Sequence, residues 1–267
     1  MTEANIFENL WNQYSSENPS AGKIHELFSQ SGNRVINDHV AFRTFNDPRT
    51  GIDVLALPFI AAGYEPRGDY KFKAKKLRAR HYELPGDPEA PRVFISELLL
   101  EEFSPWLQET ISKCLDLVPF EVFKSPELIL QGSIFKPLSN EVYSRLREES
   151  EYAAWLYVFG YRANHFTVSI NDLQDFEDIE DVNKFLKNEG YSLNSSGGEV
   201  KGTPEQMLEQ SSTLADRVEV AFQEGKFTVP SCYYEFAKRY KAAEGKLFSG
   251  FVAGSADKIF ESTDYRS

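Results

Sequence analysis

The sequence predicts an α+β fold, and three patterns lead to this prediction. Some segments alternate between two faces with a period of two, as strands do, and others repeat apolar residues every three to four positions, as helices do. In addition, two strand-like segments, DHVAFRTFND at 38–47 and NHFTVSIND at 164–172, resemble each other, since each begins with an Asx-His pair and ends with Asn-Asp. This similarity predicts two related β modules, at about 34–100 and 155–260, unless it arose by chance between two strands.

The first 33 residues predict a helical cap on the fold. Their apolar residues recur at helical spacing in two groups separated by Asn18-Pro19-Ser20, which predicts two short helices. From residue 34 the period changes to two, which predicts a strand as far as Phe45. The next expected elements are a short helix in 51–63 broken at Pro58 and a hairpin with strands at 70–84 and 92–99.

Ser104 and Pro105 predict the start of a helix, because serine caps helix N-termini and proline suits the first helical turn. Apolar residues at helical spacing continue this helix to Leu115. Beyond it, the expected elements are a helix over 139–155, a strand region over 155–170, a helix from 179 to 190, a short helix from Thr203 and a hairpin between 218 and 229.

Length and composition predict one folded domain spanning 1–267. The chain has 41 acidic and 29 basic residues, a formal net charge of −12, which argues against nucleic acid and membranes as partners. It has only two cysteines, Cys114 and Cys232, too few for a disulfide framework. The N-terminal residues lack the features of a signal peptide, and no apolar stretch reaches the roughly 20 residues of a membrane span. We therefore expect a soluble, cytoplasmic protein.

The four histidines differ in their surroundings. His25 lies on a polar helix, and His81 follows a run of six lysines and arginines at 71–80, so both are expected to be structural. His39 and His165 begin apolar strands, where a buried imidazole needs a partner. A backbone carbonyl would suffice for either one alone. Two imidazoles with one carboxylate would instead form the ligand set that suits ferrous iron and oxygen chemistry.

Two carboxylates are candidates for the third ligand. Glu97 and Glu235 are both embedded among apolar or aromatic neighbours, and the residues alone do not decide between them. Arg43 follows His39 by four positions on the same side of the strand, so it predicts either an anchor for a substrate carboxylate or a surface salt bridge. The basic run at 71–80 indicates either an entry funnel for an anion or, preferably, the solvated face of an edge strand.

Six blocks of sequence, in chain order, resemble the 2-oxoadipate dioxygenase/decarboxylase family over about residues 36–266. The resemblance implies a cupped, mixed or antiparallel β-sheet surrounded by helices, like that of vicinal oxygen chelate enzymes. It also implies that His39, His165 and Glu235 bind Fe(II), that Glu97 is structural or supports the ligands, and that Arg43 binds the substrate carboxylate. Val252 and Ser255, in a small-residue turn, correspond to a region that approaches substrate. The blocks are DHVAFRTF, FISELL, ANHFTVSIN, QSSTLADRVEVAF, CYYEFAKRY and FVAGSADKIFESTDYR.

The reaction implied by this resemblance converts 2-oxoadipate, or a related 2-oxo acid, and O2 to 2-hydroxyglutarate and CO2, as a step of lysine catabolism. No separate 2-oxoglutarate is needed, because the substrate is itself a 2-oxo acid. One alternative is a vicinal oxygen chelate metalloenzyme, an isomerase or hydrolase, that acts on a small carboxylate without O2. Another is a binding module in which the metal is structural. Family members known to catalyse the reaction are longer than this chain. The resemblance therefore predicts the metal ligands of this chain more securely than its substrate.

Overall fold

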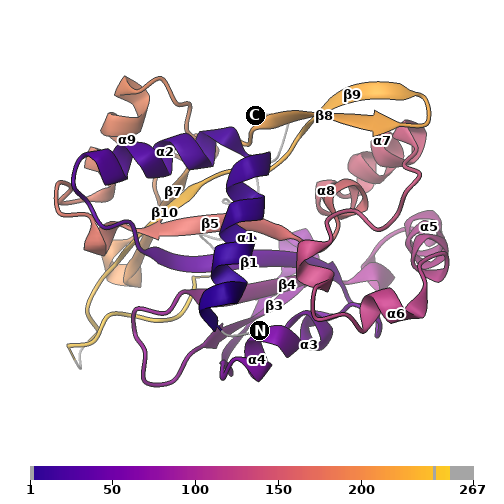
Figure 1. Cartoon of the computed structure of the whole chain (residues 1–267), viewed down its shortest axis with the longest axis horizontal. Helices are drawn as coiled ribbons and strands as arrows, with labels where there is room; N and C mark the ends of the chain where they lie inside the picture. Colours follow the sequence, from indigo (N-terminus) through magenta and orange to yellow (C-terminus); the bar gives the residue numbers. More distant parts are fainter. Residues whose placement is uncertain (1–2, 243–244, 253–267) are drawn as a thin grey trace.

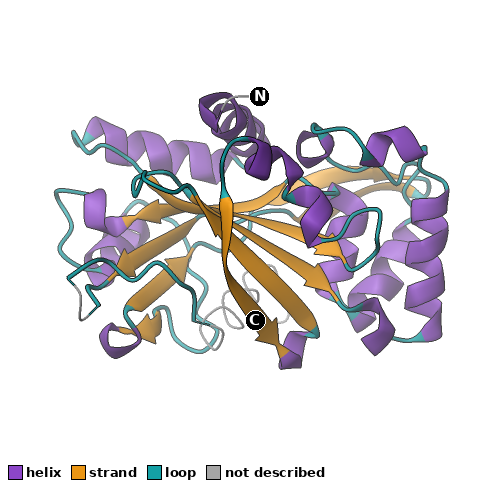
Figure 2. Ribbon diagram, turned by 90° about the horizontal axis from the view of Figure 1, so that it is seen from below, coloured by secondary structure: helices purple, strands orange, loops and turns teal. Residues whose placement is uncertain are grey.

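The computed structural model describes residues 3–242 and 245–252. Its centre is an eight-stranded mixed sheet with the strand order β2-β3-β4-β1-β5-β10-β7-β6, with helices packed around it (Figures 1 and 2). The sheet strands are β1 (Asn37–Phe45), β2 (Glu65–Phe72), β3 (Leu77–Glu83), β4 (Arg92–Leu98), β5 (Ala163–Ser169), β6 (Lys201–Thr203), β7 (Leu208–Ser212) and β10 (Glu235–Arg239), and a separate hairpin contains β8 (Arg217–Phe222) and β9 (Gly225–Pro230).

Nine helices are described besides short 3-10 turns. They are α1 (Glu3–Glu17), α2 (Pro19–Gln30), α3 (Ile52–Leu55), α4 (Leu57–Ala61), α5 (Pro105–Asp116), α6 (Phe120–Phe123), α7 (Asn140–Glu149), α8 (Glu151–Phe159) and α9 (Ile179–Asn188). Figure 1 shows α1 crossing the centre of the sheet, where it packs against β5. Within the described chain, no helix is both long and apolar enough to span a bilayer.

The two halves of the sheet have the same topology. In one half β1 is parallel to β4, which is antiparallel to β3, and β2 forms the edge. In the other half β5 is parallel to β10, which is antiparallel to β7, and β6 forms the edge. Each outer hairpin turns through a 3-10 helix followed by a left-handed residue, Lys76 (φ 54°) or Met207 (φ 62°). This is the arrangement that two related β modules would give, joined at the antiparallel pair β1 and β5.

Strand alternation separates a structural face from a functional face. On the structural face, Phe166 packs against Trp11 and Tyr14 of α1, and Phe236 packs against Phe28 of α2. The predicted N-terminal helices are therefore confirmed, and they cover one side of the sheet. Side chains one position away along β5 and β10 point to the opposite side, because successive residues of a strand face opposite ways.

Most predicted elements are confirmed, and four need correction. Residues 155–159 are not a strand, because 151–159 form α8, in which Ser150 caps the N-terminus by accepting a hydrogen bond from the amide of Ala153. The single helix expected over 139–155 is therefore two helices that meet at Ser150. The strand expected over 70–84 is two antiparallel strands, and the helix expected from Thr203 is only a 3-10 turn.

Candidate metal centre

Three buried side chains from neighbouring strands converge on the functional face. They are His39 on β1, His165 on β5 and Glu235 on β10, and one potential ligand atom from each lies within 4.8 Å of the others. Nε2 of His39 is 3.5 Å from Oε1 of Glu235, and Nε2 of His165 is 3.4 Å from Oε2. The register places Thr167 of β5 opposite both His39 and Glu235, so the fold itself brings these ligand positions together.

The cluster has the chemistry of a metal site. Oε2 of Glu235 is buried and has no hydrogen-bond partner within the described residues, which is costly for a carboxylate oxygen. The separations of 3.4 and 3.5 Å between imidazole nitrogens and carboxylate oxygens are long for hydrogen bonds. They suit donor atoms that share one cation at about 2.1 Å from each. Two imidazoles and a carboxylate form a ligand set typical of non-haem iron.

Burial sets the protonation of the ligands. It lowers the pKa of His39, an effect partly opposed by the hydrogen bond to Asp38. It lowers the pKa of His165 well below the ordinary value, helped by the nearby charges of His39 and Arg43. Both imidazoles are therefore neutral at neutral pH and keep a lone pair for a metal. Burial also raises the pKa of Glu235 to about 8 in the metal-free protein, although the hydrogen bond from Gln210 opposes the shift.

Each ligand is oriented by a neighbouring side chain. Nδ1 of His39 lies 2.7 Å from Oδ1 of Asp38, and Nδ1 of His165 lies 3.1 Å from Oδ1 of Asn164. When Nδ1 carries the proton in each ring, Nε2 faces the cluster as an acceptor. The amide of Gln210 donates to Oε1 of Glu235 at 2.5 Å. Each Asx-His pair seen in the sequence therefore supplies a candidate ligand and the side chain that orients it.

Asp38 is in turn held by a buried arginine that the sequence analysis missed. Nε and Nη2 of Arg239 donate to the two oxygens of Asp38 at 2.5 and 2.8 Å. Nη1 donates to the carbonyls of Phe248 and Gly250 at 2.9 and 2.8 Å. The ring of Phe251 then packs edge-on against His39, with centroids 4.9 Å apart. Arg239 thus connects Asp38, which orients His39, to the segment at 248–251.

Arg43 lies on the same side of β1 as His39, and only 2% of it is exposed, so the surface salt-bridge alternative is wrong. Its guanidinium lies over the rings of Tyr152 and Trp155 of α8, at 5.0 and 5.2 Å. It is also near enough to His165 to contribute to the lowered pKa of that residue. The structure therefore places a buried cation beside the ligand cluster, with aromatic rings against it.

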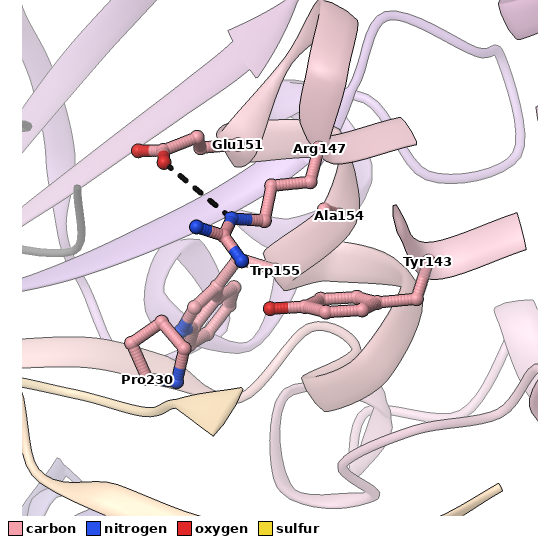
Figure 3. A pocket seen from close by; sticks show the side chains of 6 residues that line it. All are labelled: Tyr143, Arg147, Glu151, Ala154, Trp155 and Pro230. Atoms are coloured by element: carbon pink, nitrogen blue, oxygen red, sulfur yellow. Dashed lines mark ion pairs between the residues drawn. The ribbon is translucent and has the colours of Figure 1, made fainter. Parts of the chain in front are cut away.

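Trp155 also borders a small hollow, which is lined in addition by Tyr143, Arg147, Glu151 and Pro230 (Figure 3). The volume of this hollow is about 10 Å³, and Arg147 and Glu151 form an ion pair at 3.9 Å beside it. That is room for about one water molecule. The hollow is therefore too small to hold a dicarboxylic acid.

Glu97 is separate from the ligand cluster. Its Oε2 accepts a hydrogen bond from the amide of Ile52 at 2.8 Å, at the start of α3, and its Oε1 pairs with Arg78. A carboxylate at this position compensates the free amides of a helix N-terminus. Glu97 is thus a structural residue, and of the two candidate carboxylates it is Glu235 that joins the histidines.

The remaining sequence candidates are also placed by the structure. His25 packs against Trp11, and His81 is buried between the Tyr70 hydroxyl at 2.9 Å and Glu83 at 3.0 Å. The basic run at 71–80 is not one edge strand: it covers the end of the edge strand β2, the 3-10 turn at 73–75 and the start of β3, which lies between β2 and β4. Val252 is the last described residue, and Ser255 lies outside the described residues.

Comparison with known proteins agrees with this geometry. Residues 6–120 and 130–248 match the family model of the 2-oxoadipate dioxygenase/decarboxylase. A chloroplastic/amyloplastic protein of that name from Oryza sativa is 38% identical, over 97% of this chain and 78% of its own length. The crystal structure of hydroxyglutarate synthase from Oryza sativa, in complex with 2-oxoadipate, has a TM-score of 0.91 and 36% identity, covering 98% of this chain and 92% of that chain.

Two further structures bear on the fold and on the range of functions. A Shewanella frigidimarina protein, provisionally described as a hydrolase, has a TM-score of 0.89 and 53% identity, covering 94% of this chain and 98% of that chain. A glyoxalase superfamily protein from Ralstonia eutropha is only 19% identical, but its TM-score is 0.75 over 92% of this chain and 84% of that chain. The expected cupped sheet of the vicinal oxygen chelate type is therefore confirmed. Because the family model matches most of this chain, the chain belongs to the 2-oxoadipate dioxygenase/decarboxylase family.

Proposed function

We propose that this protein is an Fe(II)-dependent dioxygenase that decarboxylates 2-oxoadipate, or a closely related 2-oxo acid, to 2-hydroxyglutarate. The observation that carries the proposal is the buried cluster of His39, His165 and Glu235 in a chain of this family. The Oryza sativa relative whose structure contains 2-oxoadipate supports the choice of substrate. The cluster combines two neutral nitrogen donors with one carboxylate, which leaves other positions of a bound iron open to substrate.

When bound, Fe(II) supplies the open coordination positions and the redox chemistry that a reaction with O2 requires. The protein supplies orientation: Asp38 and Asn164 hold the two imidazoles, and Gln210 holds the carboxylate. The reaction balances without a second oxo acid. The carboxylate next to the keto group leaves as CO2, and both atoms of O2 remain in 2-hydroxyglutarate.

Arg43 binds the far carboxylate of the substrate in this proposal. A guanidinium can form two parallel hydrogen bonds to a carboxylate, and such a pair is stronger where water is excluded. The rings of Tyr152 and Trp155 exclude water from the sides of the Arg43 guanidinium that they cover. The substrate would then span from the metal to Arg43, which selects against acids without a second carboxylate. Val252 and Ser255 would contact the substrate from the C-terminal segment.

We further propose that residues 1–267 act as one catalytic domain and that lysine-derived 2-oxoadipate is the natural substrate, in the cytoplasm. Cys114 and Cys232 are free cysteines, which fits a reducing compartment. A second candidate function has one specific observation in its favour, namely the description of the Shewanella frigidimarina relative as a hydrolase. A hydrolase or isomerase on the same scaffold would use the metal but consume no O2.

The test is product formation by protein purified without O2 and loaded with Fe(II). We expect 2-hydroxyglutarate from 2-oxoadipate in air and none under anaerobic conditions. Glu235→Gln should abolish metal binding and turnover, whereas Glu97→Gln, a change in the other buried carboxylate, should leave metal binding intact. Conversion of 2-oxoadipate to a product other than 2-hydroxyglutarate, equally fast with and without O2, would favour the hydrolase or isomerase. Full activity of the Glu235 variant would refute the ligand assignment.

A further inference from the structure

We infer that Tyr233 is a second substrate-binding residue, whose hydroxyl donates a hydrogen bond to the same carboxylate that Arg43 binds. The inference rests on the proposed function and extends it. It assigns to Tyr233 part of the selection for dicarboxylic over monocarboxylic 2-oxo acids.

The backbone fixes Tyr233 beside the ligands. It precedes β10 and lies two residues before Glu235. Its ring stacks on the imidazole of His165, with centroids 4.8 Å apart and planes at 25°. Its carbonyl accepts a hydrogen bond from the hydroxyl of Tyr14 on α1, which anchors the turn into β10. The ring is therefore held against a metal ligand by contacts on both its side chain and its backbone.

The hydroxyl of Tyr233 is buried beside the Arg43 guanidinium, and only 1% of the residue is exposed. A guanidinium donates hydrogen bonds and never accepts them, so contact with Arg43 engages only a lone pair of the hydroxyl oxygen. The hydroxyl proton has no acceptor within the described residues. A buried donor without an acceptor is unfavourable, and a bound carboxylate would remove that cost.

Tyr152 provides an internal comparison, because its ring also contacts Arg43. Its hydroxyl is already engaged: it donates to the carbonyl of Ser96 at 2.6 Å and accepts from the amide of Thr44 at 3.1 Å. The role of Tyr152 is therefore to pack and hold the guanidinium. Of these two tyrosines near Arg43, only Tyr233 has a donor left for a ligand.

The neighbouring residue Tyr234 shows that an unused hydroxyl alone is not sufficient. Its hydroxyl is also buried without a partner, but its ring faces the helical side of the sheet, 5.6 Å from Trp11 and 5.4 Å from Phe236. The two tyrosines are equally buried and adjacent in sequence. They differ in the face of the sheet that they occupy, so Tyr234 is a matched control.

The test measures ligand binding to metal-loaded protein by calorimetry, under anaerobic conditions. The ligands are 2-oxoadipate and 2-oxohexanoate, which has the same chain length but lacks the far carboxylate. Tyr233→Phe should weaken 2-oxoadipate binding by about 10- to 100-fold, the loss of one hydrogen bond to a charged group. It should change 2-oxohexanoate binding by less than about twofold, and Tyr234→Phe should leave both affinities unchanged.

A double-mutant cycle tests whether Tyr233 and Arg43 act on the same carboxylate of the ligand. Because Tyr233 and Arg43 would share one carboxylate, the effect of Tyr233→Phe on 2-oxoadipate should shrink in an Arg43→Lys background. Equal losses for both ligands would overturn the inference, since Tyr233 would then act through His165. An unchanged affinity for 2-oxoadipate would also overturn it. Wild-type turnover of 2-oxoadipate, measured in parallel, separates these outcomes from failure of the proposed function.

Discussion

Replacing Arg239 by methionine tests whether the support of His39 is as important as the ligand cluster suggests. Arg239 is 2% exposed and donates to both oxygens of Asp38 and to the carbonyls of Phe248 and Gly250. The Arg239→Met variant keeps the length of the side chain but removes all these donors. The Asp38 carboxylate would then be buried with Arg92, at 3.4 Å, as its remaining cationic neighbour.

The expected effects can be estimated separately for stability and metal binding. Removing one partner of a buried ion pair costs about 3–5 kcal/mol of unfolding free energy. We expect a value of about 3 kcal/mol, at the lower end, because Arg92 still compensates part of the Asp38 charge. Loss of a group that orients a metal ligand weakens metal binding by about 10- to 100-fold. We expect this loss because Asp38 would no longer hold the His39 ring in a fixed orientation.

The stability deficit should also depend on pH. Burial alone would raise the pKa of Asp38, but Arg239 together with hydrogen bonds and Arg92 holds it well below the ordinary value. A carboxylate with a lowered pKa contributes stability above its unfolded pKa of about 3.9, and this contribution is lost as the pH falls through the folded pKa. The difference between wild type and Arg239→Met should therefore be largest at neutral pH and smaller in acid.

The assay is urea denaturation of the metal-free proteins at neutral and acidic pH, with calorimetric titration of Fe(II) or Zn(II). Arg80→Met is the control, because Arg80 forms partly exposed ion pairs with Asp69 at 2.8 Å and Asp53 at 3.2 Å. Such pairs contribute less than about 1 kcal/mol. The reasoning is refuted if Arg239→Met loses no more stability than Arg80→Met and binds metal as tightly as the wild type.

Three further results are expected. Burial raises the pKa of Glu235 to about 8 without metal, so binding of a cation below that pH must release the Glu235 proton. The measured metal affinity should therefore rise by up to about tenfold per pH unit from pH 6 to 8, and an affinity that does not change with pH would contradict this. Ser150→Ala should lower the unfolding free energy by about 1 kcal/mol, because it removes the N-cap of α8, and an unchanged urea midpoint would contradict this role. Gly160→Ala should cost at least about 2 kcal/mol, since Gly160 has φ +68° and an added Cβ would collide with the carbonyl of Gly132; a stable variant would refute the close approach.

The sequence predicted much of the ligand cluster because paired strands carry a period of two. The repeated Asx-His pairs marked His39 and His165, and the topology places their strands side by side. The choice of Glu235 over Glu97 could not be made from neighbouring residues, since both carboxylates lie in strands among apolar or aromatic residues. It depends on which strand lies next to β5, which is a property of the assembled sheet.

Other features had no local signal in the sequence. Residues 152–159 of α8 are all buried, so they show no amphipathic period and resemble a buried strand. Arg239 occurs in a basic stretch, FAKRY, that would suit a solvated surface, and its partner Asp38 is about 200 positions away. The sequence also does not single out the hydroxyl of Tyr233, because its lack of an acceptor appears only when the surrounding side chains are placed.

The measurement that tests the proposed function most directly is the stoichiometry of the reaction with Fe(II)-loaded protein and 2-oxoadipate. An oxygen electrode, CO2 detection and mass spectrometry of 2-hydroxyglutarate would be applied to the same sample. The account predicts one O2 consumed for each CO2 released and each 2-hydroxyglutarate formed, with no 2-oxoglutarate added. Conversion of 2-oxoadipate without O2 consumption, or no conversion by protein shown to hold Fe(II) at His39, His165 and Glu235, would contradict it.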